Sequence, residues 1–227
     1  SAKTENNGLI ALKDYLAAMP ETQKEIYYLI SEDLATARQS PHIEAITARG
    51  YDVLFMVDPV DSYIIERLSE FEGKKLVAAD KGDLELGTDE EKAEAKKKRD
   101  AAAGDFKALT DFIQTQLKAD VKEVRISPRL KDSACCLVAD EHAMNASMER
   151  IMRAMNQEVP VQQRILELNP EHQLILRMKA LLAENSAHPK LGDFAELLLG
   201  QALIGEGSTP KNPQRFTRIL TDLMVTI

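Results

Sequence analysis

Two aspartates in this chain lie where an enzyme of the α/β class would carry catalytic acids or metal ligands. Asp58 and Asp61 follow an apolar run, Val53–Val57, and ligands bind beyond the carboxyl ends of parallel strands. The same residues can instead cap a helix, with Asp58 accepting from free N–H groups, Pro59 at the first helical position and Asp61 three residues after the cap. The capping role accounts for every residue of DPVD. A catalytic site would also need polar groups from elsewhere in the chain that converge on these aspartates, and none is found. We therefore favour the capping role.

A second possible pair is a cysteine nucleophile with a histidine base, Cys136 with His142. No third group that would orient the base is evident. Cys135 and Cys136 are adjacent in a predicted strand, Ser133–Asp140, where neighbouring side chains point to opposite faces and a disulfide between them would be strained. Four zinc ligands at recognisable spacing are absent. We expect two reduced, buried thiols, and no catalytic residue, cofactor site or metal site in this chain.

Methionines recur at intervals of three and four in one predicted helix. The face consists of Met144, Met148, Ile151, Met152 and Met155. Methionine side chains are flexible and polarizable, and surfaces rich in them adapt to irregular partners. The same spacing is also typical of an ordinary core helix. The pattern alone favours the core helix and leaves the binding surface as an alternative.

Apolar runs predict a parallel sheet in the first part of the chain, residues 1–86. The runs are Ile26–Ile30, Asp52–Val57 and Lys75–Ala79. Continuous apolar runs are typical of strands covered on both faces. The helix between the last two would have an apolar face at Ile64, Ile65 and Leu68, and Gly73 could end it in the left-handed conformation. We expect a small three-layer α/β domain.

The remaining chain is predicted to contain a connecting helix and an α+β domain. Residues 87–104 are rich in charge and alanine, which indicates a solvated helix. Residues 105–227 begin with an amphipathic helix, with Phe106, Leu109, Ile113 and Leu117 at helical spacing. The strands Val121–Ser127 and Ser133–Asp140 follow, and only helices are expected after them.

The last two predicted helices have pronounced apolar faces. One carries Leu191, Phe194, Leu197, Leu198 and Leu203, and the other Phe216, Ile219, Leu220, Leu223 and Met224. Glycines in the loop between them end the first helix, and Asn212 and Pro213 suit the cap and first position of the second. Such a hairpin can bury its faces on its own domain, or form a four-helix bundle with a two-fold copy. The sequence leaves both arrangements open.

Composition limits the classes of partner. The chain has 227 residues, 37 acidic against 29 basic, and a net charge of -8. A nucleic-acid partner calls for a basic face, and none is visible. No apolar stretch approaches 18 residues and no signal-peptide pattern is present, so we expect no membrane partner and a cytoplasmic location. The start at Ser1 suggests a piece of a longer protein.

Three blocks of this sequence resemble the ninety-kilodalton heat-shock chaperone family, in its bacterial form, at the end of the middle domain and the C-terminal dimerisation domain. They are ETQKEIYYLI at 21–30, SPHIEAITARGYDVLFMVDPVDSYIIERLSEFEGKKLV at 40–77 and NASMERIM at 145–152. The resemblance implies a homodimer formed through the last two helices. It also implies that the methionine face contacts unfolded client proteins. Met148 matches the family's methionine, whereas Met144 stands where the family commonly carries an aromatic residue.

The resemblance further implies that ATP and Mg²⁺ bind an N-terminal domain of the full-length protein. The chain itself is then expected to hold no cofactor and to be no enzyme. Its last residues, LTDLMVTI, lack the acidic peptide of eukaryotic relatives, which favours a bacterial-type protein. A small α/β enzyme and a plain dimeric scaffold are the alternatives.

Overall fold

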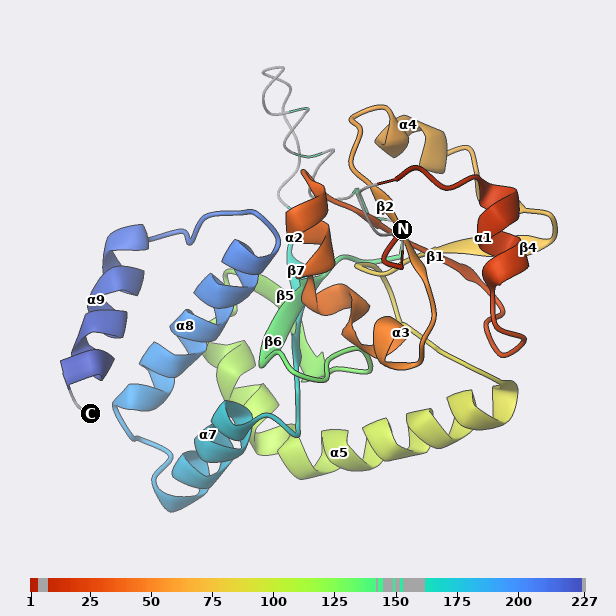
Figure 1. Cartoon of the computed structure of the whole chain (residues 1–227). Helices are drawn as coiled ribbons and strands as arrows, with labels where there is room; N and C mark the ends of the chain where they lie inside the picture. Colours follow the sequence, from red (N-terminus) through yellow and green to blue (C-terminus); the bar gives the residue numbers. More distant parts are fainter. Residues whose placement is uncertain (4–7, 142, 145–148, 150–151, 153–161, 226–227) are drawn as a thin grey trace. The chain divides into compact units, whose positions relative to one another are not determined.

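The computed structural model describes residues 1–3, 8–141, 143–144, 149, 152 and 162–225, and the chain divides into two compact units (Figure 1). Unit 1 comprises Ser1–Lys97 and Ala139–Gln162, and unit 2 comprises Lys98–Val138 and Gln163–Ile227. Both units combine a β-sheet with helices, which confirms the mixed α and β class. No helix within the described part of the chain is long and apolar enough to cross a membrane.

Unit 1 is built on a four-stranded sheet of order β2–β1–β4–β3. Its strands are β1 (Ile26–Ile30), β2 (Val53–Met56), β3 (Glu70–Phe71) and β4 (Lys74–Ala78). Strand β1 pairs in parallel with β2 and with β4, while β3 runs antiparallel to β4. The three predicted strands and their parallel direction are confirmed. Strands β2 and β4 lie on either side of β1 rather than next to each other.

The two faces of this sheet pack against different helices. Unit 1 contains α1 (Leu12–Ala18), α2 (Leu34–Arg38), the 3-10 helix η2 (Pro41–Ile43), α3 (Glu44–Ala48) and α4 (Asp61–Ile65). Side chains alternate along a strand, so Tyr27 and Leu29 of β1 join a cluster with Ala37 of α2 and Ile46 of α3. Ile26 joins the opposite cluster, which contains residues of α1.

The segment after β2 differs from the prediction at its end. Helix α4 stops at Ile65, and Gly73 lies in the tight turn between β3 and β4. Both turn residues have positive φ, 46° at Glu72 and 76° at Gly73, as a type I′ hairpin requires. Gly73 does adopt the predicted left-handed conformation, but the prediction that it ends the helix was wrong.

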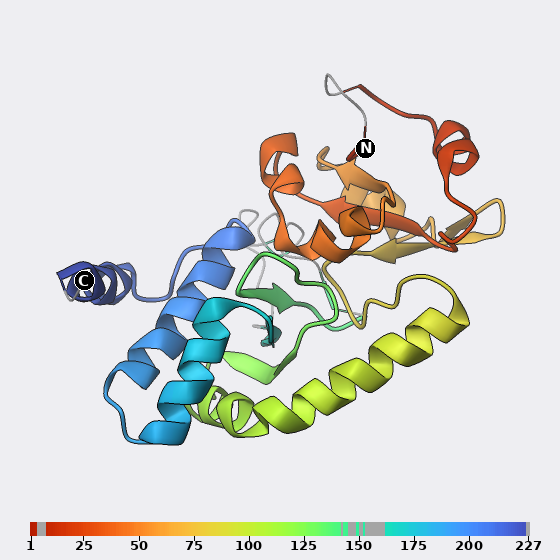
Figure 2. The same ribbon diagram turned by 60° about the horizontal axis from the view of Figure 1, so that its bottom comes forward.

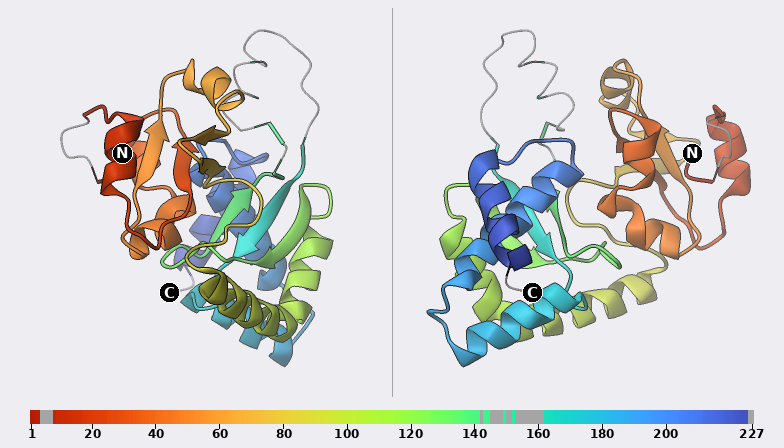
Figure 3. Two further views of the ribbon diagram at one scale, coloured as in Figure 1. Left: turned by 90° about the vertical axis from the view of Figure 1, so that its right-hand side faces the viewer. Right: turned by 60° about the vertical axis from the view of Figure 1, so that its left-hand side comes forward.

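Unit 2 contains a three-stranded sheet of order β5–β7–β6, with β7 in the centre (Figure 3). The strands are β5 (Val121–Ile126), β6 (Cys135–Val138) and β7 (Arg164–Leu168). Strand β7 pairs in parallel with β5 and antiparallel with β6. Two predicted strands are confirmed. The prediction that only helices follow the cysteine strand was wrong, because it missed the central strand.

Strand β7 carries a fully buried charge, which obscures its apolar pattern. Glu167 is 0% exposed, and its carboxylate accepts hydrogen bonds from Arg125 Nη2 at 2.7 Å and from Ser127 Oγ at 2.7 Å. Arg129, also 0% exposed, donates from Nε at 2.9 Å. A buried carboxylate is tolerated when it is paired and hydrogen-bonded in this way. The tertiary structure thus permits a glutamate in the middle of a core strand.

Helices cover one face of this sheet (Figure 2). They are α5 (Asp89–Gln116), α7 (Gln173–Glu184) and α8 (Lys190–Gly205), and α9 (Pro213–Val225) follows them. Leu109 and Ile113 of α5, Met178 of α7 and Leu198 of α8 share one core cluster with Leu166 of β7. The predicted solvated helix and the amphipathic helix that follows it are one continuous helix, α5.

The first turns of α5 are fixed to unit 1. Thr88 and Glu91 form a reciprocal capping box, with Thr88 N–H donating to Glu91 Oε2 at 2.7 Å. Arg49 pairs with Glu91 at 3.1 Å, and Lys92 pairs with Glu25 at 3.2 Å. The Thr88 N–H, together with Arg49, lowers the pKa of Glu91. The helix therefore starts at a defined position on unit 1.

Candidate functional site

Helices α8 and α9 form a pair joined by residues 206–212. The cap predicted at the start of α9 is present, because Asn212 Oδ1 accepts from the Arg215 N–H at 3.0 Å and Pro213 is the first helical residue. Gly207, with φ of 80°, lies just beyond the end of α8. Figure 1 shows α9 lying beside α8. The sequence therefore determined both ends of the connecting loop.

The Phe216 ring of α9 packs against α8. A Cβ atom added at Gly200 of α8 would lie 2.5 Å from Phe216 Cε2, closer than atoms can approach. The ring thus occupies space that only a glycine leaves open. Ile219, one turn further along α9, is 5% exposed. The Phe216 contact therefore holds α9 against α8.

Charge pairs flank the aromatic contact. The Arg215 guanidinium binds both carboxylate oxygens of Glu196, with Nη2 at 2.8 Å from Oε1, and also contacts Asp193 Oδ1 at 3.1 Å. Hydrogen bonding to Glu196 raises the pKa of Arg215. All three side chains are partly exposed, so water screens the pairs and they contribute less than the apolar contacts.

The residues predicted to form a dimer interface are the ten apolar residues of the last two helices except Leu203, and these nine lie in different environments. Leu191 and Leu198 are 0% exposed within unit 2, so they have no accessible area left for a partner. Ile219 is buried as well. Phe194, Leu197, Phe216 and Leu223 are half-buried, while Leu220 and Met224 are exposed. The interface stays a prediction, and within this structure its apolar area can come only from the half-buried and exposed residues.

Three large apolar residues of α9 are exposed. Leu220 is 37% exposed, Met224 73% and Val225 81%. Of these, Val225 was not among the predicted interface residues. Large apolar side chains gathered on one helix face are typical of a surface that a partner covers.

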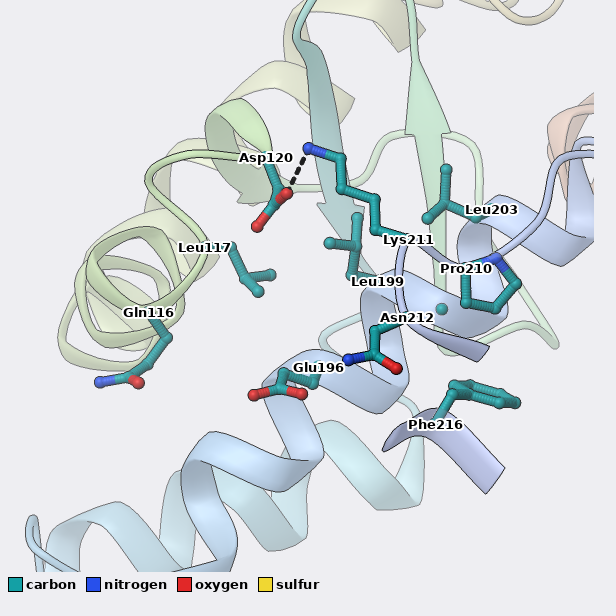
Figure 4. A pocket seen from close by; sticks show the side chains of 11 residues that line it. Gln116, Leu117, Asp120, Glu196, Leu199, Leu203, Pro210, Lys211, Asn212 and Phe216 are labelled. Carbon is teal, nitrogen blue, oxygen red and sulfur yellow. Dashed lines mark ion pairs between the residues drawn. The ribbon is translucent and has the colours of Figure 1, made fainter. Parts of the chain in front are cut away.

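A hollow of about 210 Å³ lies between the end of α5, helix α8 and the start of α9 (Figure 4). Leu117, Leu199 and Phe216 form part of its apolar wall. At its rim, Lys211 forms an ion pair with Asp120. This cation and this carboxylate therefore neutralise each other.

The methionine face lies largely outside the described residues. Met148, Ile151 and Met155 are not described, while Met144 and Met152 are both half-buried. This intermediate exposure fits neither a fully buried core helix nor a fully exposed surface. The choice between core and contact surface therefore stays open.

A second apolar surface, which the sequence analysis missed, lies on unit 1. Val60, Tyr63 and Ile64, at and next to α4, are 51%, 54% and 46% exposed. The sequence assigned Ile64 to the buried face of a longer helix. Because α4 spans only Asp61–Ile65, it has too few turns to bury a continuous stripe. We call Val60, Tyr63 and Ile64 the α4 patch.

The residues of the two possible catalytic pairs that the structure describes have structural roles. Asp58 Oδ1 accepts from Val60 N–H at 3.0 Å, and Asp61 Oδ2 accepts from Asp58 N–H at 3.0 Å, so the two aspartates hydrogen-bond to the backbone of this segment as expected. Helix α4 begins only at Asp61, with Val60 as its cap residue, so the prediction that Asp58 caps it and that Pro59 is its first residue was wrong. Cys136 is 1% exposed, and His142 lies outside the described residues. Among the described residues, no group of three or more His, Cys, Asp and Glu could hold a metal ion.

Neither Cys135 nor Cys136 forms a disulfide, and the two side chains face opposite sides of the sheet of unit 2. Cys135 belongs to the cluster beneath α5, α7 and α8, whereas Cys136 belongs to a cluster with Leu130 and Ile165. The Cys135 thiol donates to the Leu198 carbonyl with a 3.2 Å separation, and burial raises its pKa to about 12. A thiol with so high a pKa is a poor nucleophile.

Comparison with known proteins gives one family. The model of the family described as "Hsp90 protein" matches residues 1–227, the full length of the chain. The chain belongs to the Hsp90 protein family. Relatives named "Chaperone protein HtpG" are 49% identical over 225 residues in Geobacter metallireducens and in Geobacter sulfurreducens, covering 99% of this chain and 35% of each relative. The protein of that name from Frankia casuarinae is 44% identical over 211 residues, covering 93% of this chain and 32% of its own length.

This Hsp90 chain spans about a third of the length of the curated relatives it matches. The first of its resembling blocks ends with β1, and the second contains η2, α3, β2, α4 and β3. The α4 patch therefore lies inside the longest block. Most of the third block, 145–152, lies outside the described residues.

Proposed function

We propose that this chain is the dimerisation and client-binding part of an ATP-dependent molecular chaperone, which binds unfolded proteins and helps them fold. The observation that carries the proposal is that the apolar face of α9 is only partly buried. Phe216 packs against Gly200 of α8 and Ile219 is buried, while Leu220, Met224 and Val225 stay exposed. Membership of the Hsp90 family and the name of the relatives, "Chaperone protein HtpG", support a chaperone role.

The exposed side of α9 offers enough apolar area for a dimer. Its three exposed side chains present on the order of 300 Å² per protomer, so burial in a two-fold pair contributes roughly 15 kcal/mol at about 25 cal/mol per Å². Association costs about 4–15 kcal/mol in lost translational and rotational freedom. The half-buried residues Phe194, Leu197 and Leu223 would add to the gain. We therefore propose a four-helix bundle made of two α8–α9 hairpins.

The proposed domain organisation follows the family. Residues 1–86 form the C-terminal, three-layer α/β part of a middle domain. Residues 87–104 connect it to a C-terminal dimerisation domain, residues 105–227. The continuous helix α5, with its capped and ion-paired start, supports the connecting role.

The dimer is tested by sedimentation equilibrium of the chain over a wide concentration range. We expect a dimer that Leu220→Asp splits while the melting temperature changes little, because Leu220 is 37% exposed. The matched control is Leu176→Asp on α7, at 40% exposure, which should leave the dimer intact. A wild-type chain that is monomeric at every concentration would refute the bundle.

We propose two contact surfaces for unfolded clients, the methionine face and the α4 patch. A permanently unfolded probe such as reduced, carboxymethylated lactalbumin, with fluorescence anisotropy as the readout, measures binding. We expect Ile64→Asp to weaken binding about tenfold with little change in melting temperature, because the side chain is 46% exposed. Leu176→Asp again serves as the control. Equal affinity in wild type and Ile64→Asp would remove the α4 patch from the proposal.

The methionine face is tested with Met148→Lys in the same assay. If the face contacts clients, probe binding weakens while the melting temperature is kept. If the face is core, the substitution unfolds the domain instead, because an unpaired charge cannot be buried at small cost. The second result would leave a plain dimeric scaffold as the function of this segment.

We further propose that the chain binds no cofactor, nucleic acid or membrane and acts in the cytoplasm. In the longer relatives, ATP and Mg²⁺ would bind a part that this chain does not match. Titration calorimetry of the chain with ATP and Mg²⁺ should give no binding heat. A measurable affinity would contradict this assignment.

A further inference from the structure

A short extended segment lies along one edge of the sheet of unit 1. Strand β2 is the last strand on one side of this sheet, in the order β2–β1–β4–β3. The Val53 carbonyl of β2 accepts from Ala2 N–H at 2.8 Å, and the Asp52 carboxylate accepts from Lys3 N–H at 3.1 Å. The contacts therefore move back along β2 as the segment advances, as in an antiparallel strand pair. We call Ser1–Lys3 the edge strap.

An arginine of α2 clamps the backbone of the edge strap. Arg38 donates from Nη1 to the Ala2 carbonyl at 3.0 Å and from Nη2 to the Ser1 carbonyl at 3.5 Å. Its guanidinium lies over the Phe55 ring, with 5.7 Å between Cζ and the ring centroid. A planar guanidinium can bind two acceptors while its face stacks on an aromatic ring. Arg38 thus binds the main chain of the strap, which does not depend on the strap's sequence.

The surface beneath the edge strap is held in place by other parts of unit 1. Ala2 packs against the cluster that contains Ala37 of α2 and Val53 of β2. The Asp52 carboxylate also accepts from Val53 N–H at 2.8 Å, and the Asp52 carbonyl accepts from the buried Tyr15 hydroxyl at 2.6 Å. All of these residues belong to unit 1. The acceptor that binds the strap is therefore positioned by bonds that do not involve the strap.

Strand β2 presents a second residue to the same edge. The Met56 carbonyl accepts from Ser31 N–H at 3.0 Å, on the side of β1, whereas the Val53 carbonyl faces away from β1. Directions alternate along a strand, so Phe55, two positions after Val53, presents its N–H and carbonyl to the edge as Val53 does. A longer extended segment can therefore pair with both residues.

We propose that the edge of β2, with Arg38 as its clamp, binds an extended stretch of an unfolded protein, which adds to the sheet as a further strand. The edge strap shows the recognition chemistry, because its bonds use main-chain groups that every polypeptide carries. Peptides that add to a sheet edge gain affinity from such bonds. The strap and the unfolded protein compete for this edge. The inference rests on the proposed client-binding function and deepens it by naming the extended backbone as the bound feature.

A proline at position 2 releases the edge strap. Ala2→Pro removes the N–H that donates to Val53, and Ala2→Ser, which keeps this N–H, is the matched control. Nuclear magnetic resonance relaxation measures the order parameter of the Lys3 N–H. We expect it to fall below about 0.6, the range of flexible backbone, in Ala2→Pro, and to keep its wild-type value in Ala2→Ser. An unchanged order parameter in Ala2→Pro would refute the pairing.

Binding of the carboxymethylated lactalbumin probe then tests the edge as a client site. We expect Ala2→Pro to strengthen binding at least about threefold, because the competing strap is gone, and Ala2→Ser to bind as wild type does. Adding Arg38→Met, at an exposed position, should abolish the gain. Adding Lys13→Met, which removes an exposed cation of α1, should keep it. No gain in Ala2→Pro, or a gain that survives Arg38→Met, would refute the proposal.

A short peptide separates this site from the proposed function. The synthetic peptide Ser-Ala-Lys-Gly-Ser, added to the Ala2→Pro chain at millimolar concentration, should shift the Val53 and Phe55 amide resonances in a saturable way. The same peptide with proline in second place should not. If lactalbumin binds neither the wild type nor any variant, the proposed function fails, while the peptide still decides whether the edge accepts an extended segment. Absence of saturable shifts would refute the site.

Discussion

Helices α8 and α9 have similar apolar patterns in sequence but different environments in the structure. In α8, Leu191, Ala195 and Leu198 are 0% exposed and belong to the interior of unit 2. In α9, only Ile219 is buried, while Leu220 and Met224, which follow Phe216 at intervals of four residues, are exposed. Helix α8 lies directly on the sheet, and α9 lies on α8. The comparison shows that one amphipathic hairpin can contain both a core helix and a candidate interface helix.

The largest loss of stability is expected from a substitution in the core helix, α8. Leu198→Ala truncates a fully buried side chain of α8 and should lower the free energy of unfolding by about 2–5 kcal/mol. Leu220→Ala, in the partly exposed position on α9, should cost under about 1 kcal/mol when measured on the monomer. Urea unfolding followed by circular dichroism measures both. Equal losses would contradict the division between the two helices.

The next largest loss of stability is expected from disturbing the contact between α9 and α8. Gly200→Ala forces the Phe216 ring from its seat and should cost about 1–3 kcal/mol through overpacking. Gly192→Ala, in the same helix, is the matched control, because the nearest atom to its added Cβ is 3.6 Å away. That variant should gain up to about 1 kcal/mol from helix propensity. If Gly200→Ala left the free energy of unfolding unchanged, the Phe216 ring would be free to move away from the added methyl group.

The third effect concerns pH and the attachment of α8. The pKa of Cys135 is raised by burial from 9.0 to about 12 in the folded chain. Its contribution to stability is therefore fully present below pH 9 and is lost as pH rises through about 12. At a pH of about 10 the loss should be about 1 kcal/mol relative to neutral pH. Urea unfolding at several alkaline pH values measures it, and Cys135→Ala should be less sensitive.

The smallest effect concerns the charged contact between the helices. Arg215→Gln removes the pairs with Glu196 and Asp193, which are partly exposed. We expect a loss of under about 1 kcal/mol. The difference between wild type and variant should shrink in about 1 M salt, where charges are screened beyond about 3 Å. A salt-independent difference would indicate that packing of the Arg215 stem, rather than charge, stabilises the contact.

Local signals predicted much of the fold. Strand β1 has the predicted bounds, the aspartates of DPVD hydrogen-bond to the backbone of their own segment, and Asn212 and Pro213 start α9. In each case the residues that determine the structure are close together in sequence. Strand β7 was missed because its stability depends on Arg125 and Arg129, about 40 positions away, which neutralise Glu167. Sequence pattern cannot show that a charge will be paired across such a separation.

The candidate surfaces show the same limit. The apolar spacing of α8 and α9 was visible in sequence, but the spacing could not show which side each helix turns inward. For α4, the spacing predicted an apolar face at Ile64, Ile65 and Leu68, and the structure leaves Ile64 exposed. Spacing reports that a helix has an apolar side, while exposure depends on what lies next to it.

The sequence by itself determined the family, the short-range elements and the capping residues, because these depend on neighbouring residues and on long matching blocks. Only the tertiary structure decided which apolar side chains remain accessible, that a buried glutamate lies in a central strand, and that Lys81 forms a parallel bridge with Ala139. These features depend on contacts between residues far apart in the chain. Burial and pairing at such distances are decided only when the elements pack together.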